Sequence, residues 1–156
     1  LRAMVGLEGA RLVIFGEGPD EAALREQIAA MHLGQVVTLA GPRASVADEI
    51  AAADVFVVSS RWESGPLVLL EAMMLGRPVV STAVGLAPQI VRDGDTGRLL
   101  PVGDAAALGA AIAEVLADPA HAAAMGDRGR RAVESAYSSD AIVTRIEHVY
   151  RQVLHR

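Results

Sequence analysis

The sequence predicts an α/β fold in which helices cover both faces of a doubly wound parallel sheet. Three observations support this prediction. Short, largely apolar runs alternate with helix-length segments, the runs show no regular polar alternation, and glycine or proline stands at many of the boundaries. Runs without polar alternation are typical of parallel strands that are buried on both faces. Regular alternation of such strands with helices is typical of βαβ units.

The strands are expected at five apolar runs that are bounded by turn or loop signals. They are residues 11–16, 36–41, 55–60, 78–83 and 97–101. After the last run the chain becomes rich in alanine, and its apolar residues recur at a spacing of about 3.6 residues. This pattern predicts three consecutive helices, over residues 104–119, 121–137 and 139–154. No repeat or low-complexity linker interrupts residues 1–156, so we expect a single domain.

Capping residues set the expected ends of the helices that connect the strands. The first helix is expected to begin near Pro19 and to end at Gly34, because proline favours the first helical position and glycine the position after the last turn. Ser45 is expected to cap the second helix, since a hydroxyl can accept a hydrogen bond from the first free amides. The third helix is expected to begin with Pro66 and to stop at Gly76.

Composition and charge exclude several kinds of site and partner. The net charge of −5 gives no support to a nucleic-acid partner. The absence of cysteine excludes disulfides and thiolate metal sites, and the four histidines are scattered without the spacing of metal ligands. No apolar run approaches the roughly 20 residues that a membrane span needs. All 14 basic residues are arginine, so any task that requires lysine falls outside this chain.

The stretch ESGPLVLLE, residues 63–71, is the main functional signal, because it places two carboxylates around the start of a helix. Glu63 follows the third expected strand, at the edge where open parallel sheets bind ligands. Glu71 lies in the second turn of an otherwise apolar helix. For Glu71 two interpretations are open: a solvated or arginine-paired surface charge, and a carboxylate that faces a ligand cleft. Glu63 could equally be a solvated loop charge.

A nucleotide sugar would use all parts of this segment. A carboxylate accepts two hydrogen bonds side by side, an arrangement that suits neighbouring hydroxyls of a sugar or a ribose. The helix start between the two acids offers the amides of Leu67 and Val68, and free amides at a helix start suit a phosphate. One short segment could therefore hold sugar hydroxyls, a diphosphate and a ribose.

The segment SRWESGPLVLLEAMMLGRPVVSTAVG, residues 60–85, resembles the donor-binding signature of retaining GT-B glycosyltransferases of group 1 (family 4). That signature has two Glu residues separated by seven others, then Ala-Met and a Gly-x-Pro-Val-Val strand. The matching positions here are Glu63, Glu71, Ala72, Met73, Gly76, Pro78, Val79 and Val80. The segments RLVIFGEGP and VGLAPQIVRDGDTGRLLPVGD also resemble their counterparts, so the resemblance covers residues 1–118.

The resemblance implies a set of donor-binding residues, namely Gly16, Arg43, Glu63, Ser64, Gly65, Leu67, Val68, Glu71 and Gly85. Glu63 would bind hydroxyls of the transferred sugar, and it is the candidate catalytic residue. Glu71 would bind the hydroxyls of the ribose. The amides of Leu67 and Val68 would hold the diphosphate.

Three further positions would surround the donor in this family. The backbone near Arg43 would meet the base, Gly16 would border the phosphates or the sugar, and the loop at Gly85 would approach from the opposite side. The implied donor is a UDP-, GDP- or ADP-linked hexose, and the implied reaction transfers the hexose to an acceptor. No metal or other cofactor is implied, because arginine, lysine and helix dipoles neutralise the leaving diphosphate.

The resemblance also implies that other parts of such an enzyme lie upstream of Leu1. They are the first strand of this lobe, with its phosphate-binding arginine and lysine, and an N-terminal domain that binds a glycan, lipid or small-molecule acceptor. We therefore expect that residues 1–156 alone transfer no sugar. A cytoplasmic location is expected, and membrane attachment of the full-length enzyme is left open.

Departures from the family pattern keep alternatives open. Family members often carry Phe-Gly after the first Glu, where this chain has Gly65-Pro66. They usually carry Gly-Gly and a later Glu, where this chain has Gly85-Leu86 and Gln89. A degenerate, non-catalytic nucleotide-binding lobe is one alternative, and a nucleotide-sugar epimerase on the same scaffold is another. A receiver-type regulatory domain fits poorly, because the chain has no lysine and its third strand ends VFVVSSRWE.

Overall fold

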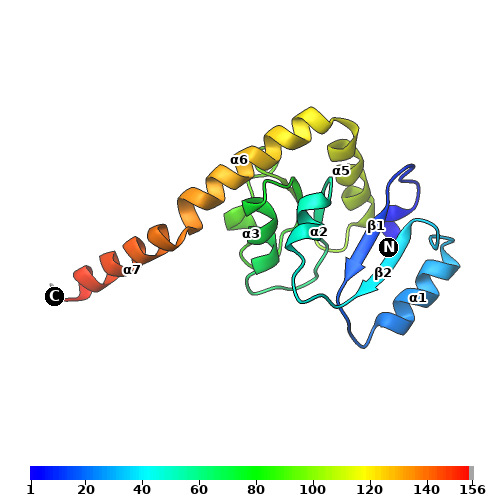
Figure 1. Ribbon diagram of the computed structural model, residues 1–156, viewed down its shortest axis with the longest axis horizontal. Helices are drawn as coiled ribbons and strands as arrows, with labels where there is room; N and C mark the ends of the chain where they lie inside the picture. Colours follow the sequence, from blue (N-terminus) through cyan, green and yellow to red (C-terminus); the bar gives the residue numbers. More distant parts are fainter. Residues whose placement is uncertain (155–156) are drawn as a thin grey trace.

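The computed structural model describes residues 1–154 and has the expected α/β architecture (Figure 1). All five expected strands form, as β1 (Leu12–Phe15), β2 (Val37–Gly41), β3 (Phe56–Val58), β4 (Val79–Thr82) and β5 (Arg98–Leu100). The helices are the short 3₁₀ helix η1 (Arg2–Met4), α1 (Glu21–Ala30), α2 (Ala47–Ala52), α3 (Leu67–Met74), α4 (Ala87–Ile90), α5 (Ala105–Ala117), α6 (Pro119–Tyr137) and α7 (Ser139–Leu154). The three consecutive helices at the end of the chain are thereby confirmed.

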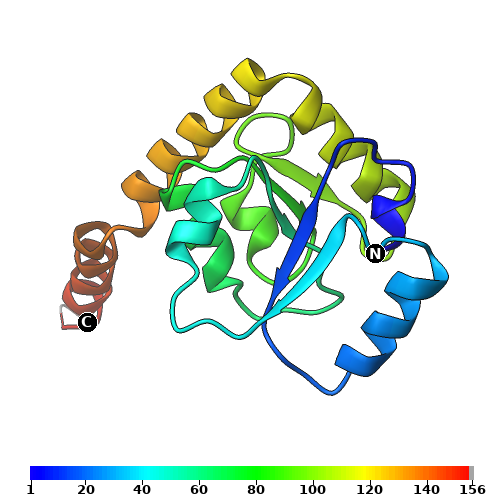
Figure 2. The same ribbon diagram turned by 45° about the vertical axis from the view of Figure 1, so that its right-hand side comes forward.

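The strands are all parallel, but they form two hydrogen-bonded groups. β1 pairs with β2, and β3, β4 and β5 pair in that order with β4 in the centre. Within residues 1–154 no strand pairing joins the two groups. Figure 2 shows β1 and β2 (blue and cyan) as a separate pair, with α1 beside them at the edge of the molecule.

The main core is centred on β4, whose four residues are all buried. Because successive side chains of a strand point to opposite faces, Val79 and Val80 belong to different clusters. Val79 packs in one cluster with Leu69 and Met73 of α3, and Val80 packs in another with Ile112 of α5. Helices therefore cover both faces of the three-stranded group, as expected for a doubly wound fold.

The expected end of α1 at Gly34 is wrong, because the helix ends at Ala30. His32 adopts the left-handed conformation, with φ of 56°, and the amide of Leu33 donates to the carbonyl of Ile28 at 2.9 Å. This is a Schellman arrangement, in which an apolar residue after the helix packs against its last turn. The buried side chain of Leu33 thus fixes the helix end at a position where the sequence carries no glycine.

Two other boundaries depend on caps. α2 begins at Ala47, and the expected cap by Ser45 is wrong, because Val46 holds the cap position without a side-chain hydrogen bond. Only the expected position is wrong, because the Ser45 hydroxyl still accepts a long hydrogen bond, at 3.4 Å, from the amide of Ala47, the first residue of the helix. The expected stop of α3 at Gly76 is confirmed. Gly76 has φ of 68°, and the amide of Arg77 donates to the carbonyl of Ala72 at 3.0 Å.

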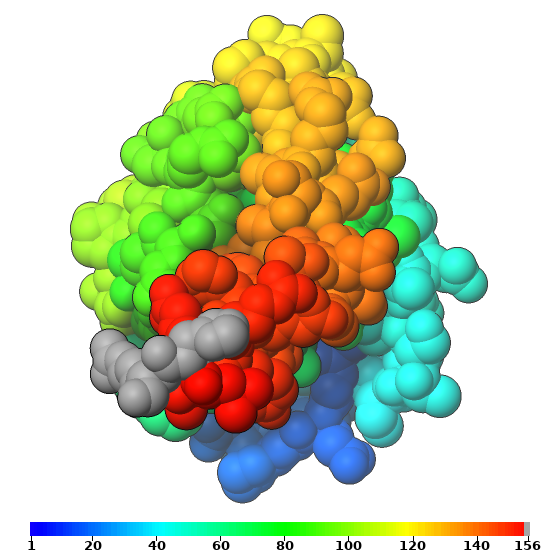
Figure 3. Space-filling view, turned by 90° about the vertical axis from the view of Figure 1, so that its left-hand side faces the viewer, coloured from blue at the N-terminus to red at the C-terminus, as the bar shows by residue number. Residues whose placement is uncertain are grey.

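The last two helices differ in how they pack. α6 lies against α3, and a Cβ atom at Gly126 would collide with the carbonyl oxygen of Gly76, so glycine allows this close approach. α7 has no buried residue and projects from the body of the molecule (Figure 1). Figure 3 views the molecule from this end, with α7 (red) in front of α6 (orange). None of the helices described here is long and apolar enough to span a bilayer.

Candidate functional site

Most of the expected donor-binding residues lie at the carboxyl ends of two neighbouring strands. Residues 59–66 connect β3 to α3, and residues 83–86 connect β4 to α4. Because β3 and β4 are paired and parallel, both connections leave the same edge of the sheet. Open α/β sheets bind ligands at this edge.

The side chain of Glu63 is held by a short polar network. The hydroxyl of Ser60 donates to Oε1 of Glu63 at 2.9 Å, and the hydroxyl of Thr82 lies 2.7 Å from the carbonyl oxygen of Ser60. Thr82 is the last residue of β4 and is buried. The carboxylate of Glu63 is thereby connected to the central strand.

Gly85 brings the second connection against the first. It has φ of 51°, and a Cβ atom there would collide with the carbonyl oxygen of Glu63 and lie 2.8 Å from that of Ser64. The side chain of the next residue, Leu86, lies beside Gly65 of the first connection, 3.4 Å from where a Cβ at that glycine would be. Only glycine at position 85 therefore lets the two loops pack this closely.

The start of α3 presents free amides. Pro66 is buried and holds the cap position just before the helix, which corrects its expected place as the first helical residue. The amide of Leu69 donates to the carbonyl of Pro66 at 2.9 Å, and no side chain caps the helix. The first amides of a helix have no partner inside it, so those of Leu67 and Val68 can donate hydrogen bonds to a bound anion.

Glu71 lies one turn further along α3 and is exposed. No arginine within residues 1–154 forms a salt bridge with it, which removes the arginine-paired interpretation. Leu67 and Met74 share its helical face at spacings of four and three residues, and both are exposed. The opposite face of α3 is buried in the core. Glu71 therefore stands on an open face of α3 that carries exposed apolar side chains.

Gly16 and Arg43 lie together at the carboxyl ends of β1 and β2. Gly16 has φ of 125°, and its amide donates to the carbonyl of Gly41 at 2.9 Å. The guanidinium of Arg43 stacks over the ring of Phe15, 5.7 Å from its centroid, and lies 3.8 Å from Glu49. Within residues 1–154 no hydrogen bond or ion pair connects this pair to the segment that contains Glu63 and Glu71.

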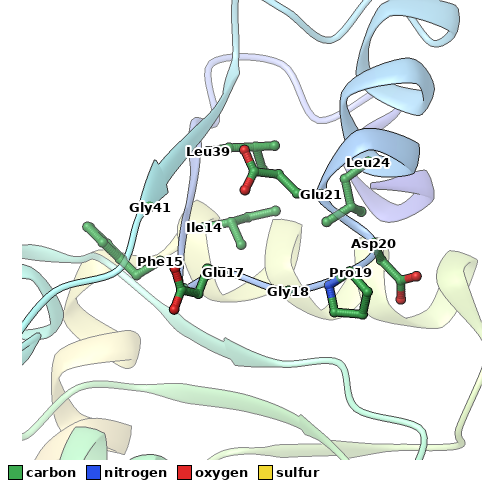
Figure 4. A pocket seen from close by; sticks show the side chains of 11 residues that line it. Ile14, Phe15, Glu17, Gly18, Pro19, Asp20, Glu21, Leu24, Leu39 and Gly41 are labelled. Atoms are coloured by element: carbon green, nitrogen blue, oxygen red, sulfur yellow. The ribbon is translucent and has the colours of Figure 1, made fainter.

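A cavity of about 250 Å³ opens between β1, β2 and the start of α1 (Figure 4). Ile14, Leu24 and Leu39 point toward one another inside it, whereas the carboxylate of Asp20 points away. Glu17 and Glu21 also line the cavity. Carboxylates disfavour a second anion nearby, so this cavity suits a diphosphate less well than the start of α3 does. Sequence analysis did not anticipate the cavity, since apolar strand residues are expected in any core.

The structure thus brings the segment 63–71 and Gly85 together at one sheet edge, and Gly16 and Arg43 together at another. Sequence analysis missed Ser60 and Thr82. The only signal for them was a polar residue at the end of each apolar strand, and such residues are common in loops. Within residues 1–154 no group of three or more His, Asp or Glu side chains is arranged to hold a metal ion.

Comparison with known proteins identifies the family. The family model described as "Glycosyl transferases group 1" matches residues 1–132. The chain is 34% identical over 145 residues to N-acetyl-alpha-D-glucosaminyl L-malate synthase of Bacillus anthracis, covering 93% of this chain and 38% of that protein. It is 36% identical over 162 residues to D-inositol 3-phosphate glycosyltransferase of Mycobacterium avium, covering 99% of this chain and 38% of that protein.

Solved structures of similar fold support the same family. Sucrose-phosphate synthase (tll1590) from Thermosynechococcus elongatus superposes with a TM-score of 0.87 at 34% identity, covering 98% of this chain and 41% of that chain. Anabaena Alr3699/HepE, solved in complex with UDP, superposes with a TM-score of 0.85 at 23% identity, covering 92% and 41%, and this likeness concerns the fold. The chain thus spans about two fifths of the length of these relatives. It belongs to the group 1 (family 4) glycosyltransferases, and it has the Rossmann-like fold of the C-terminal lobe of GT-B transferases.

Proposed function

We propose that this chain is the donor-binding lobe of a retaining glycosyltransferase that moves a hexose from a nucleoside diphosphate to an acceptor. The observation that supports this most is the arrangement around α3. A tethered carboxylate at Glu63, free amides at Leu67 and Val68, and an open carboxylate at Glu71 follow one another along one sheet edge. These three features suit the sugar, the diphosphate and the ribose of one donor molecule.

Each group has a separate role in this proposal. Glu63 accepts hydrogen bonds from sugar hydroxyls, and its carboxylate lies next to the reacting carbon of the sugar. The amides of Leu67 and Val68, with the positive end of the α3 dipole, offset the charge that develops on the leaving diphosphate. Glu71 accepts hydrogen bonds from the two ribose hydroxyls.

The remaining positions enclose the donor. Gly85 keeps its loop close to Glu63, Ser64 and Gly65 complete the loop that carries it, and the backbone near Arg43 contacts the base. Gly16 has an open side toward which phosphate or sugar can lie, since nothing is within 4 Å of a Cβ at that position. The donor would therefore extend from the β3–α3 loop to the ends of β1 and β2.

We also propose that the chain works as part of a larger enzyme. In the usual doubly wound order, 3-2-1-4-5-6, the first strand lies between the second and the fourth. The two strand groups here, β2–β1 and β3–β4–β5, correspond to that order with the first strand left out. A preceding strand with phosphate-binding basic residues and a separate acceptor-binding domain would complete the site, and we expect no sugar transfer by residues 1–156 alone.

A non-catalytic nucleotide-binding lobe is the second candidate. Gln89 stands where the family usually has a glutamate, and it is exposed, so it can contact a ligand without contributing charge. Pro66 has no amide to donate at the loop that carries Glu63. These departures would affect sugar transfer more than nucleotide binding, so binding of a nucleotide sugar without turnover by the full-length protein would favour this candidate.

Calorimetric titration of the full-length protein with UDP, GDP and ADP tests the proposal. UDP is the first probe, since a protein of the same fold was solved with it. We expect Glu71→Ala to weaken binding of the preferred nucleotide about tenfold or more, because a hydrogen bond to a charged group contributes about 1.5–3 kcal/mol. The loss should become much smaller when the 2′-deoxynucleotide replaces the ribonucleotide.

Glu26→Ala provides the control, since Glu26 is an exposed carboxylate on α1, outside the proposed site. This variant should bind the nucleotide as the unaltered protein does. Lack of binding of all three nucleotides by the unaltered full-length protein would contradict the proposed function.

A further inference from the structure

We propose that Ser60 is a positioning residue that sets the orientation of the Glu63 carboxylate, and that Thr82 holds Ser60 in place. This inference rests on the proposed function, because Glu63 matters here as the group that binds the transferred sugar. It assigns a specific task to two hydroxyl side chains that lie beneath the site rather than in it.

The bond between Ser60 and Glu63 has one possible direction. An ionised carboxylate only accepts hydrogen bonds, so the Ser60 hydroxyl donates its single proton to Oε1, at 2.9 Å. Within residues 1–154 the carboxylate of Glu63 has no other hydrogen-bond partner and no arginine in salt-bridge contact. Oε2 therefore stays available for sugar hydroxyls, while Oε1 fixes the plane of the carboxylate.

Thr82 connects Ser60 to β4, the central and fully buried strand of its group. Its hydroxyl oxygen lies 2.7 Å from the carbonyl oxygen of Ser60 and 3.4 Å from that of Val58, so its single proton goes to Ser60. Thr82 is only 4% exposed and pairs with Leu100 of β5 in the strand register. The start of the β3–α3 loop is therefore fixed to the central strand.

Gly85 constrains the same loop from its other side. The carbonyl oxygens of Glu63 and Ser64 occupy the space that a Cβ at position 85 would need, so the two loops are closely packed at the backbone, whereas Ser60 holds the side chain of Glu63. A carboxylate held at both points loses little freedom when a sugar binds, and such preorganisation increases affinity by lowering the entropy lost on binding. The expected consequence is specific: Ser60 should affect the sugar part of donor binding and leave the nucleotide part unchanged.

Affinity ratios can separate these two parts. The full-length protein is titrated with UDP-glucose against UDP, and likewise with the glucose conjugates of GDP and ADP against their nucleotides. We expect Ser60→Ala to lower the affinity for the sugar nucleotide several-fold relative to the free nucleotide, with the free-nucleotide affinity unchanged. Ser60→Thr keeps a hydroxyl and should restore the ratio. Thr82→Val keeps the shape of the side chain without its hydroxyl, and it should change the ratio in the same direction but less.

Two controls show whether Ser60 acts through Glu63. Ser59→Ala removes an adjacent exposed hydroxyl that makes no hydrogen bond within residues 1–154, and it should leave the ratio unchanged. In a Glu63→Ala background, Ser60→Ala should have no further effect on the ratio. Thermal unfolding of each variant shows whether the fold is retained.

The outcomes separate this inference from the proposed function. If the protein binds nucleotides but Ser60→Ala keeps the original ratio, the positioning role is contradicted and the proposed function stands. Equal weakening of nucleotide and sugar nucleotide would indicate a general structural role and would also contradict the inference. If no nucleotide or sugar nucleotide binds to the unaltered full-length protein, both proposals fail.

Discussion

The two strand groups of this molecule are packed very differently. Around β4, both faces of the sheet are covered by helices, and Leu69, Met73 and Val79 are completely inaccessible to solvent. Around β1 and β2, the cluster contains only three buried residues, and α1 has no buried residue at all. The parts that carry Glu63 and Glu71 therefore rest on the well-packed group, and the parts near Gly16 and Arg43 rest on the loosely packed one.

The register of β1 and β2 shows which face of this strand pair is uncovered. Val13 of β1 and Thr38 of β2 are register partners, and both are exposed, so one face of this pair is open to solvent. Parallel strands are normally covered on both faces. α1 covers the other face, where Ile14 and Leu39 line the cavity. In the proposed binding mode, the groups assigned to the sugar and the ribose therefore rest on the well-packed group, whereas Gly16 and Arg43 lie on the pair of strands with one open face.

Truncation of one leucine in each group gives the largest expected contrast. Leu69→Ala removes a side chain with no exposed surface from the α3–β4 core, where the surrounding residues have little room to relax. We expect it to lower the free energy of unfolding by about 3–5 kcal/mol. Leu33→Ala makes the same chemical change in the small β1–β2 cluster, and we expect a loss of about 2 kcal/mol.

Urea denaturation of both variants measures these losses, with the slope of the unfolding free energy against urea concentration as the control. An unchanged slope shows that the compactness of the two end states is the same. Equal losses at the two leucines would refute the contrast between the groups. A biphasic unfolding transition in the unaltered protein would strengthen the contrast, because it would show that the β1–β2 group unfolds before the β4-centred group.

Much of the fold could be predicted from the sequence, whereas the division into two strand groups, the end of α1 and the contacts beneath Glu63 could not. The apolar runs at the strands and the stop at Gly76 follow from local rules, because each depends on residues adjacent in the chain. The end of α1 could not be predicted, because His32 adopts a glycine-like conformation to bury Leu33, and that burial is a tertiary effect. The contact between Ser60 and Thr82 joins residues 22 positions apart, and no local pattern encodes it.

A matched pair of glycines offers the next test. Gly85 and Gly41 both have positive φ, 51° and 70°. Gly85 lies in the loop after β4, and Gly41 is the last residue of β2. A Cβ at Gly85 meets the carbonyl oxygen of Glu63, whereas nothing lies within 4 Å of a Cβ at Gly41. We expect Gly41→Ala to cost about 1–2 kcal/mol from backbone conformation alone. Gly85→Ala should cost roughly 2–4 kcal/mol, since the collision adds to the conformational term.

Measuring the binding of a sugar nucleotide also distinguishes these two glycines. Gly85→Ala should also weaken binding of a sugar nucleotide, because the loop that carries Glu63 must move away from its collision with the new methyl group. Thermal unfolding gives the stability of each variant, and calorimetry gives the affinity. A Gly85→Ala protein with the stability and sugar-nucleotide affinity of Gly41→Ala would show that the contact between the two loops has no energetic role.

The smallest expected effect concerns acid stability in the well-packed group. The pKa of Asp93 is lowered chiefly by the hydrogen bond that its carboxylate accepts from the amide of Leu99, at 2.9 Å, and further by Arg98. The pKa of Asp95 is lowered chiefly by a hydrogen bond from Arg92, with a further contribution from Arg128. Both carboxylates lie in the turn that leads into β5.

The sign of the pH effect follows from these directions. A carboxyl group whose pKa is lower in the folded than in the unfolded protein stabilises the fold above the unfolded pKa, and this contribution is lost as the pH falls through the folded pKa. We therefore expect thermal stability to fall below about pH 4, and Asp93→Asn to reduce that dependence. The effect should be small, because exposed ion pairs contribute little. Asp54→Asn, which removes an exposed carboxylate outside this turn, should leave the slope unchanged. An Asp93→Asn protein with the original acid slope would show that the turn before β5 does not contribute to the stability of the β4-centred group.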